Sequence, residues 1–562
     1  MSGFDSFATW LRRAWEPVAV LIDRYWTTTA ERGFLRRVQR TAPQAPEIKP
    51  VVLVETIEDD YYLALFALIV RGIEKRQPVE VHQFVSRSLR PGSARSPYHA
   101  LKSLFYYNRL TDGKWARLYA GFCSRVAYRS VAHTLSWASV VDLRDAFRIW
   151  RNLKSKESLV DLKVSGIALG DLVYDTYLRF RPRETVNLKS LYLWVVIWQA
   201  LRDLRAARAY MFNVKPQMLL TNYSCYVQHG IAVRMALSAG VKVITFGNYQ
   251  SFYKQLLATD WVHTANPEGY LTGFTRLENP AGKIAESESA LAARVAGKID
   301  PATVYMQRSA YARTAALPPG ISGSLVLFLH DFFDSPHCYQ WMIFPDFCEW
   351  ATFTLDLARR AGIKVFVKPH PNQIENSKEI VAKLTKDYPD VTWLSSDTSN
   401  VQLAEAGAAC AVTVYGTVAH EMAYLGVPSI AAGHNPHVAF GFSHTARSRE
   451  EYARLIENYQ YLRDSPEKLR RESLEFYCMH NLQIDAHQRG LRDLLLAFRA
   501  LVTEHGGTIR RGSGLLSFAQ ALEAEPAYHR ACGELAALLH DTLSGEPSSE
   551  HEALILEQVA PG

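Results

Sequence analysis

A chain of 562 residues is too long for a single hydrophobic core, so we expect two large domains with additional segments. Its 48% hydrophobic and 21% charged residues are typical of a folded protein and exclude an intrinsically disordered one. The net charge of +7 is spread along the chain, which argues against a nucleic-acid binder. The same charge suits anionic partners such as nucleotide diphosphates, acidic sugars or lipid headgroups.

Cysteine usage and hydropathy indicate a cytoplasmic protein. The seven cysteines are scattered and odd in number, without the spacing of a zinc site, which predicts free thiols in a reducing compartment. Residues 1–13 lack a signal-peptide pattern, and the longest apolar stretch, Leu191–Leu201, is too short to span a bilayer. We therefore expect a soluble protein, or one that is peripheral on the inner face of the membrane.

The first elements along the chain are a basic amphipathic helix and a linker. Residues 7–40 carry apolar side chains at helical spacing, with arginines between them. Such a helix either lies on a membrane surface or packs on its own domain. The proline-containing segment 42–50 is predicted to be a linker.

A first domain of alternating strands and helices follows. Strand, helix and strand are predicted at 51–55, 59–75 and 79–85, and again at 218–221, 230–239 and 242–246. Residues 96–210 are expected to be mostly helical, with a short irregular segment at 166–169. A helical stretch at about 284–314 leads to the linker Leu317–Gly323.

The second half has the pattern of a doubly wound domain. Strands are predicted at 325–329, 364–367, 391–394, 411–414 and 429–432, with helices near 348–361, 375–387, 401–408 and 417–425. Further helices follow from Arg449 onward, with a glycine-rich break at 505–514. The predicted organisation is a helical segment 1–45, a Rossmann-like acceptor domain 46–316, a Rossmann-like nucleotide domain 324–482, and helices with a tail at 483–562.

The segment Val414–Pro428 predicts an anion site at the start of a helix. A buried strand ends there, Gly416 allows a sharp turn, and Thr417 is expected to cap the helix that follows. Free amides and the helix dipole would then favour a phosphate. Glu421 lies one turn further on, where a carboxylate can accept hydrogen bonds from ribose hydroxyls. The alternative is a capped helix with a solvent-exposed glutamate.

Two further segments follow predicted strands of the second domain. Lys368-Pro-His-Pro371 follows the strand 364–367, and its prolines aim His370 beyond the strand end, where ligands bind in this architecture. An imidazolium can bind a phosphate or protonate a leaving group. His330 begins a polar loop that also contains Asp331, Asp334 and His337, and this loop is expected to close on donor or acceptor. Its spacing matches no common metal-ligand pattern, so no metal is expected.

The first domain offers carboxylates for proton transfer. In Gly166–Arg179, Asp171 and Asp175 are four residues apart and would share one helix face. Either would serve as the base that removes the acceptor hydroxyl proton, with Asp171 preferred; the alternative is that Asp171 only caps a helix. The acidic run 58–60 is a rival, and Tyr223 and His229, before the helix 230–239, are expected to touch the acceptor.

Together these motifs resemble GT-B fold glycosyltransferases of the capsule and surface polysaccharide type. Gly-Thr-x3-Glu-x4-Gly-x-Pro after a buried strand is similar to their nucleotide-sugar signature, and Lys-Pro-His-Pro is similar to the His-Pro motif of such transferases. The resemblance implies two Rossmann-like doubly wound domains that face a cleft, with added helices at both ends. It implies that Gly416 and Thr417 contact phosphate, Glu421 contacts ribose, and Ser399, in the segment 397–403, lies beside the base or phosphates.

The resemblance implies a glycosyltransferase that uses a nucleotide sugar as co-substrate and holds no tightly bound cofactor. A CMP-linked acidic sugar is slightly preferred as donor because of the His-Pro motif, with a capsule or surface polysaccharide or a glycolipid as acceptor. In this assignment His370 and an aspartate are catalytic, and Lys368 and His330 contact the donor. The alternatives are a polyol-phosphate transferase of the same fold, a 2-epimerase, or a non-catalytic scaffold in a polysaccharide assembly complex.

Overall fold

The computed structural model describes residues 26–39, 49–85, 114–129, 137–180, 183–246, 251–264, 266–298, 315–371, 373, 375–462, 464–483, 486–504 and 514–544. Most of the predicted amphipathic helix 7–40 and of the linker 42–50 lies outside these residues. The described part of that helix is α2 (Thr29–Val38), which begins with a capping box between Thr28 and Glu31. Phe34 and Val38 of α2 are buried in the first domain, so this part of the helix packs on its own protein.

The first domain is built on a six-stranded sheet in the order β3-β2-β1-β6-β7-β8. All neighbouring strands are parallel except β8, which runs antiparallel to β7. The strands are β1 (Val51–Thr56), β2 (Glu80–Val85), β3 (Arg125–Arg129), β6 (Met218–Thr221), β7 (Lys242–Phe246) and β8 (Tyr253–Leu256). Strand β3 lies in a region that was expected to be mostly helical, and that expectation is wrong there.

Helices of this part of the chain surround the sheet and extend from it. They are α3 (Asp60–Glu74), α5 (Lys114–Ala120), α6 (Trp137–Asn152), α7 (Lys156–Val160), α8 (Gly170–Phe180), α9 (Leu191–Val214), the π-helical turn η1 (Tyr226–Gly230), α10 (Ile231–Ser238), the 3-10 turn η2 (Pro267–Gly269), α11 (Tyr270–Thr275) and α12 (Pro280–Val295). The segment expected at 166–169 is part of a small hairpin of β4 (Lys163–Val164) and β5 (Ile167–Ala168). Its turn residues Ser165 and Gly166 both have positive φ, as a tight hairpin turn requires.

The second domain contains a fully parallel six-stranded sheet in the order β11-β10-β9-β12-β13-β14. This is the doubly wound order of a Rossmann fold. The strands are β9 (Leu325–Phe328), β10 (Val365–Lys368), β11 (Thr392–Trp393), β12 (Cys410–Thr413), β13 (Ser429–Ala431) and β14 (Ser443–Thr445). The helices between and after them are α13 (Phe347–Ala361), α14 (Glu375–Asp387), α15 (Asn400–Glu405), α16 (Val418–Tyr424), α17 (Arg449–Glu457), the 3-10 turn η3 (Tyr459–Tyr461), α18 (Pro466–Tyr477) and the π-helical turn η4 (Cys478–Leu482).

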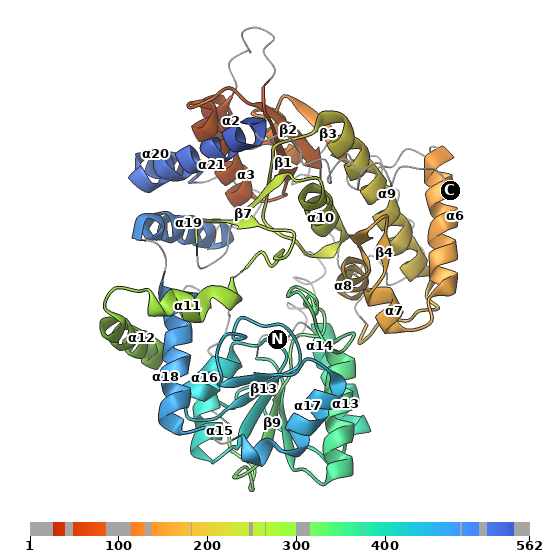
Figure 1. The fold of residues 1–562 in the computed structure, drawn as a ribbon, viewed down its shortest axis with the longest axis vertical. Coiled ribbons are helices and arrows are strands. Elements are labelled where there is room, and N and C mark those ends of the chain that lie inside the picture. The colour runs from red at the N-terminus through yellow and green to blue at the C-terminus, as the bar shows by residue number, and fades with distance from the viewer. Residues whose placement is uncertain are drawn as a thin grey trace, which may run out of the picture.

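The two sheets confirm the predicted fold class of two Rossmann-like doubly wound domains, the arrangement expected of the GT-B type. Figure 1 shows the first domain above the second. Helix α12 lies before the linker 317–323 in the chain, but it packs against α18, and its Leu291 shares a buried cluster with Tyr424 and Leu474 of the second domain. The first half of the chain therefore contributes a helix to the second domain.

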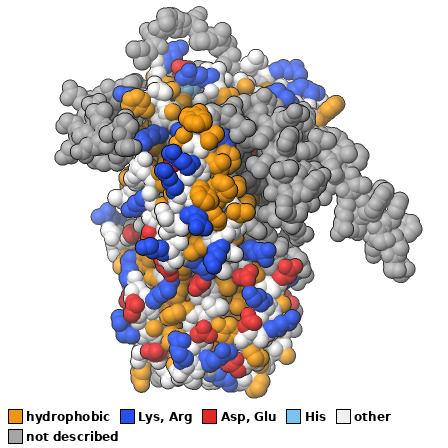
Figure 2. Space-filling view, turned by 90° about the vertical axis from the view of Figure 1, so that its right-hand side faces the viewer, with side chains coloured by type: hydrophobic (Ala, Val, Ile, Leu, Met, Phe, Trp, Pro, Cys, Tyr) orange, Lys and Arg blue, Asp and Glu red, His pale blue; other side chains and the backbone are white. Residues whose placement is uncertain are grey.

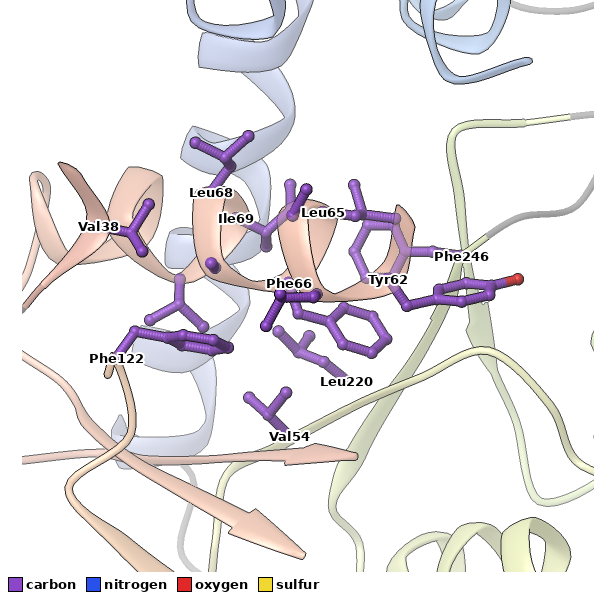
Figure 3. Packing of buried hydrophobic residues seen from close by; sticks show 14 of the residues in the cluster. Val38, Val54, Tyr62, Leu65, Phe66, Leu68, Ile69, Phe122, Leu220 and Phe246 are labelled. Atoms are coloured by element: carbon purple, nitrogen blue, oxygen red, sulfur yellow. The ribbon is translucent and has the colours of Figure 1, made fainter. Parts of the chain in front are cut away.

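The last helices return to the first domain. Helices α19 (Ala486–Glu504), α20 (Leu515–Ala524) and α21 (Pro526–Ser544) all contact α3, which lies between them and the sheet. Helix α3 has buried side chains on every face, because Phe66 and neighbouring residues contact Val54 and Leu220 of the sheet while α19–α21 cover the outer side (Figure 3). The added C-terminal helices are thus part of the first hydrophobic core.

No helix in the described part of the chain is both long and apolar enough to cross a membrane.

Candidate functional site

The carboxyl ends of the two sheets face each other through the loops that follow their strands. The loop after β9 approaches the turn after β6, where the Tyr226 hydroxyl lies beside Ser335. Gln340 of the same loop donates from Nε2 to the Thr259 carbonyl oxygen at 2.7 Å, and His434, after β13, lies 2.6 Å from Glu268. Ligands of doubly wound domains bind at this edge, so residues at these strand ends are the candidates for function.

A chain of buried polar side chains runs from Lys368, the last residue of β10, to Arg294 of α12. Lys368 Nζ donates to Asn400 Oδ1 at 2.8 Å, and Asn400 Nδ2 donates to Glu421 Oε2 at 2.8 Å. The other carboxylate oxygen of Glu421 accepts from Arg294 Nε at 3.2 Å and Nη2 at 2.8 Å. Glu421 is therefore a buried, paired carboxylate and not the solvent-exposed glutamate of the alternative interpretation.

Lys368 is a buried ammonium that is held by an amide oxygen. Its side chain is 3% exposed, and burial lowers its pKa to about 8, although Glu421 and Asp397 favour the charged form. Among the described residues its Nζ has one hydrogen-bond acceptor, the amide oxygen of Asn400, and no carboxylate at ion-pair distance. A buried positive charge with spare donors favours an anion beside it.

His370 lies just beyond Lys368, half-buried among charged groups. Burial lowers its pKa below the ordinary value, while Asp331 and Asp334 act in the opposite direction and Lys368 adds to the lowering. The position after β10 agrees with the expectation that the two prolines direct His370 beyond the strand end. Its catalytic role stays a prediction.

His330, at the end of β9, is held against the end of β12. Its Nε2 accepts a hydrogen bond from the Val414 backbone N–H at 3.2 Å and lies 3.0 Å from Thr413 Oγ1. Because Nε2 is an acceptor here, the proton of the neutral ring is on Nδ1. Burial, with a contribution from His370, lowers its pKa to about 3, and the ring stacks on Phe347.

The turn before α16 has the predicted shape but not the predicted cap. Thr417 is the N-cap residue, yet its side chain makes no capping hydrogen bond, so that expectation is wrong. At Gly416 a Cβ would lie 2.8 Å from Thr413 Oγ1, so the turn needs glycine for space. The amide groups of Thr417 and Val418 have no acceptor among the described residues, as usual in a first helical turn.

Ser399 begins α15 and acts as its cap. Its hydroxyl accepts from Gln402 N at 3.1 Å, and Gln402 Oε1 accepts from Ser399 N at 3.0 Å, which makes a complete capping box. The next residue, Asn400, bridges Lys368 and Glu421 and was not singled out by sequence reasoning. The sequence signal that could have identified Asn400 was its position at the start of a helix that follows a strand.

The two first-domain aspartates are both paired. Asp171 makes a bidentate ion pair with Arg234 of α10, with 2.6 Å between Oδ1 and Nη1. Burial raises the pKa of Asp171, but the Arg234 guanidinium outweighs burial and the pKa lies below its ordinary value. A carboxylate held in this way is a weak proton acceptor, so the structure does not favour Asp171 over other bases.

Asp175 reaches across to the second domain. It accepts from His337 Nδ1 at 2.7 Å and from the His337 backbone N–H at 3.2 Å. Although burial disfavours the imidazolium, Asp175 and then Asp171 raise the pKa of His337 above its ordinary value. The adjacent Tyr174 hydroxyl donates to Asp346 Oδ2 at 2.5 Å, so both residues join α8 to the loop after β9. Sequence reasoning placed His337 in a polar loop but did not find this pair.

Of the histidines after β13, His437 packs beside α16. His437 is buried, packs on Phe476 and lies 3.3 Å from His420, and burial lowers the pKa of both rings well below the ordinary value. A pocket of about 440 Å³ opens between residues 341–343 and 447–449, and none of the candidate site residues lines it.

Comparison with known proteins gives similar structures but no family. No protein-family model matches the chain, and no curated protein matches it. The chain is similar to the solved structure of Thermosulfurimonas dismutans KpsC, a beta Kdo 2,4 transferase, with 16% identity over 46% of this chain and 80% of that chain and a TM-score of 0.29.

Two further structures are similar over more of the chain. One is the Methanocaldococcus jannaschii UDP-GlcNAc 2-epimerase, with 10% identity over 74% of this chain and 93% of that one and a TM-score of 0.24. The other is a glycosyltransferase from Rickettsia africae, with 8% identity over 81% and 98% and a TM-score of 0.25. These scores are too low to carry an argument, and the fold assignment rests on the strand orders of the two sheets.

Proposed function

We propose that this protein is a glycosyltransferase that moves a sugar from a nucleotide-activated donor to a capsule or surface polysaccharide or a glycolipid. A CMP-linked acidic sugar is the preferred donor. The observation that carries the proposal is Lys368: a buried ammonium at the carboxyl end of a doubly wound sheet, held within the described residues by an amide and not by a carboxylate. A nucleotide phosphate would supply the missing negative charge.

The groups around Lys368 would contact different parts of the nucleotide donor. The unpaired amides of Thr417 and Val418 would donate to phosphate oxygens, since they begin α16 beside the same strand ends. Glu421 accepts hydrogen bonds from Arg294 and Asn400 but keeps further lone pairs, which would accept from ribose hydroxyls. Ser399 would act by holding the start of α15, and with it Asn400.

His370 is proposed to stabilise the leaving nucleotide. Burial lowers its pKa, so the ring without ligand favours the neutral form at neutral pH. A phosphate beside it would favour the imidazolium, because an opposite charge stabilises the charged form. The ring would therefore become a proton donor when the donor substrate is bound.

We also propose a peripheral contact with the inner face of the membrane, where a lipid-linked acceptor would lie. Figure 2 looks onto a face where hydrophobic side chains gather among lysines and arginines. On α6 and at the start of α9, Trp137, Phe147 and Leu191 are 82%, 43% and 63% exposed, and Arg144 and Arg148 are exposed beside them. Aromatic side chains with arginines suit an anionic lipid surface.

The donor proposal is tested by thermal-shift binding of CMP, UDP, GDP, CDP and their sugar conjugates. One nucleotide class should stabilise the wild type, by about 2.7 kcal/mol at 100 times its dissociation constant. Lys368→Met and His370→Ala should weaken the shift, whereas the exposed His529→Ala should keep it. No shift with any nucleotide would overturn the proposal and favour a scaffold.

The membrane contact is tested by co-sedimentation with phosphatidylcholine vesicles that contain or lack phosphatidylglycerol. Wild type should bind the anionic vesicles, and the double variant Trp137→Ser with Phe147→Ser should lose most of this binding. Tyr461→Ser is the matched control, because Tyr461 is 82% exposed on the second domain. Equal binding of all three proteins would refute a role for this face.

A further inference from the structure

A further carboxylate–histidine pair lies at the carboxyl end of the first sheet. Glu55, near the end of β1, is fully buried, and its Oε1 lies 2.5 Å from His229 Nδ1 in the turn η1. The other oxygen of Glu55 accepts a hydrogen bond from the Thr221 hydroxyl at the end of β6. Because a carboxylate only accepts, the proton between the two groups is on Nδ1, and Nε2 of the neutral ring is a lone-pair acceptor.

The Nε2 side of His229 is the accessible side. The His229 side chain is 15% exposed, and Nε2 has no hydrogen-bond partner among the described residues. Asp171 and Asp175 lie nearby in the same domain, but Arg234 and His337 occupy their carboxylates. Among the described residues of this domain, His229 is therefore a proton acceptor that is oriented by a carboxylate and whose Nε2 is open.

The backbone that carries His229 is unusual. It begins at Tyr226, a bulky residue with φ of 61°, and continues as a single π-helical turn. The Val227 amide donates to Thr176 Oγ1 at 2.8 Å, which fixes this turn on α8. Strained residues and π turns persist where the surroundings hold them, and they gather at functional sites.

A partly exposed aromatic ring lies beside the pair. The Tyr223 ring is 5.6 Å from the His229 ring and 4.8 Å from the His263 ring, and Tyr223 is 39% exposed. His263 lies 2.9 Å from Ser224 Oγ, and burial lowers its pKa to about 3, so it adds no charge. An aromatic face next to an open imidazole is an arrangement that can hold a sugar ring with a hydroxyl toward Nε2.

We infer that His229, oriented by Glu55, is the base that deprotonates the acceptor hydroxyl, and that Tyr223 forms part of the acceptor subsite. This inference rests on the proposed glycosyl transfer. The acceptor oxygen bonds to the anomeric carbon while its proton passes to His229 Nε2. The bond from that carbon to the nucleotide phosphate breaks, and the electron pair leaves with the phosphate. Glu55 stabilises the imidazolium, which then returns its proton to solvent.

The test compares His229→Gln with wild type and with the control His529→Gln. Nucleotide release is measured from CMP-N-acetylneuraminic acid, UDP-N-acetylglucosamine and GDP-mannose, with methyl glycosides as probe acceptors. His229→Gln should keep the nucleotide thermal shift of the second domain and lose about 10²–10⁴-fold in turnover. Turnover within about threefold of wild type would overturn the inference, and a loss confined to Asp171→Asn would assign the base to Asp171. A wild type that binds no nucleotide would refute the proposed function instead.

A second measurement needs no turnover. Histidine ring NMR should show the ring proton of neutral His229 on Nδ1 in wild type, and Glu55→Gln should weaken this preference because a neutral amide replaces the carboxylate acceptor. A methyl glycoside should perturb the His229 resonances in wild type and not in Tyr223→Ala. A tautomer preference that is unchanged by Glu55→Gln, or resonances that no glycoside perturbs, would overturn the inference.

Discussion

The buried pair of Arg294 and Glu421 allows a quantitative test of how the two halves of the chain depend on each other. The residues are 127 positions apart, and their side chains are 1% and 5% exposed. Arg294→Met leaves the Glu421 carboxylate buried with Asn400 as its remaining partner. Breaking a buried ion pair on one side costs about 3–5 kcal/mol. We expect a loss of that size in the apparent free energy of unfolding.

The assay is urea unfolding of four proteins: wild type, Arg294→Met, Glu421→Gln and the double variant. The double variant should be more stable than the sum of the single losses predicts, because no uncompensated charge remains. Arg359→Met is the control, since Arg359 and Asp390 form an exposed pair whose interaction is screened by water and salt. If Arg294→Met costs no more than Arg359→Met, or if the two changes add, the pair does not stabilise the fold as reasoned.

Three further outcomes are expected. Nucleotide affinity, measured by calorimetry, should fall as pH rises through about 8, where Lys368 loses its charge, and Lys368→Met should remove this dependence. The pKa of His337 is raised in the folded state, so its pairing with Asp175 stabilises the fold fully below the unfolded pKa of about 6.5. This stabilisation is lost as the pH rises through the folded pKa. Asp175→Asn should therefore flatten the fall in melting temperature above that pH. Gly170→Ala should destabilise by more than about 2 kcal/mol in urea, because a Cβ would lie 1.7 Å from the Leu159 carbonyl oxygen.

The second domain could be predicted closely from the sequence. Its strands are short apolar runs between amphipathic helices, and β9 to β13 each lie within one or two residues of the prediction. The edge strand β14 (Ser443–Thr445) was missed because three residues with a polar centre carry no periodic signal. Strand β3 was missed for a similar reason: its sequence is basic, and pairing with β2 decides its conformation.

The candidate site could be predicted in position but not in its pairings. Strand ends and turns are local features, so Lys368, His370 and Gly416 were placed correctly at the carboxyl edge of the second sheet. Arg294, which pairs with Glu421, and His337, which pairs with Asp175, come from segments that are more than 100 residues away from these carboxylates. No local pattern encodes such contacts, because they depend on how α12 and α8 pack against the second domain.

The segment Gly166–Arg179 was singled out in the sequence for its aspartates. It also contacts the turn that carries His229 and the loop after β9, next to the proposed donor site. Three consecutive residues of α8 make hydrogen bonds to other segments. Tyr174 donates to Asp346, Asp175 accepts from His337, and Thr176 accepts from the Val227 backbone N–H of η1. Helix α8 is thus in direct contact with the turn that carries His229 and with the loop that follows β9. Since His370 lies at the end of the neighbouring strand β10, a shift of α8 would change the separation of His229 from the donor site. Loss of activity in an Asp175 variant would therefore not by itself identify a base, whereas the His229 and Glu55 variants leave these α8 contacts in place.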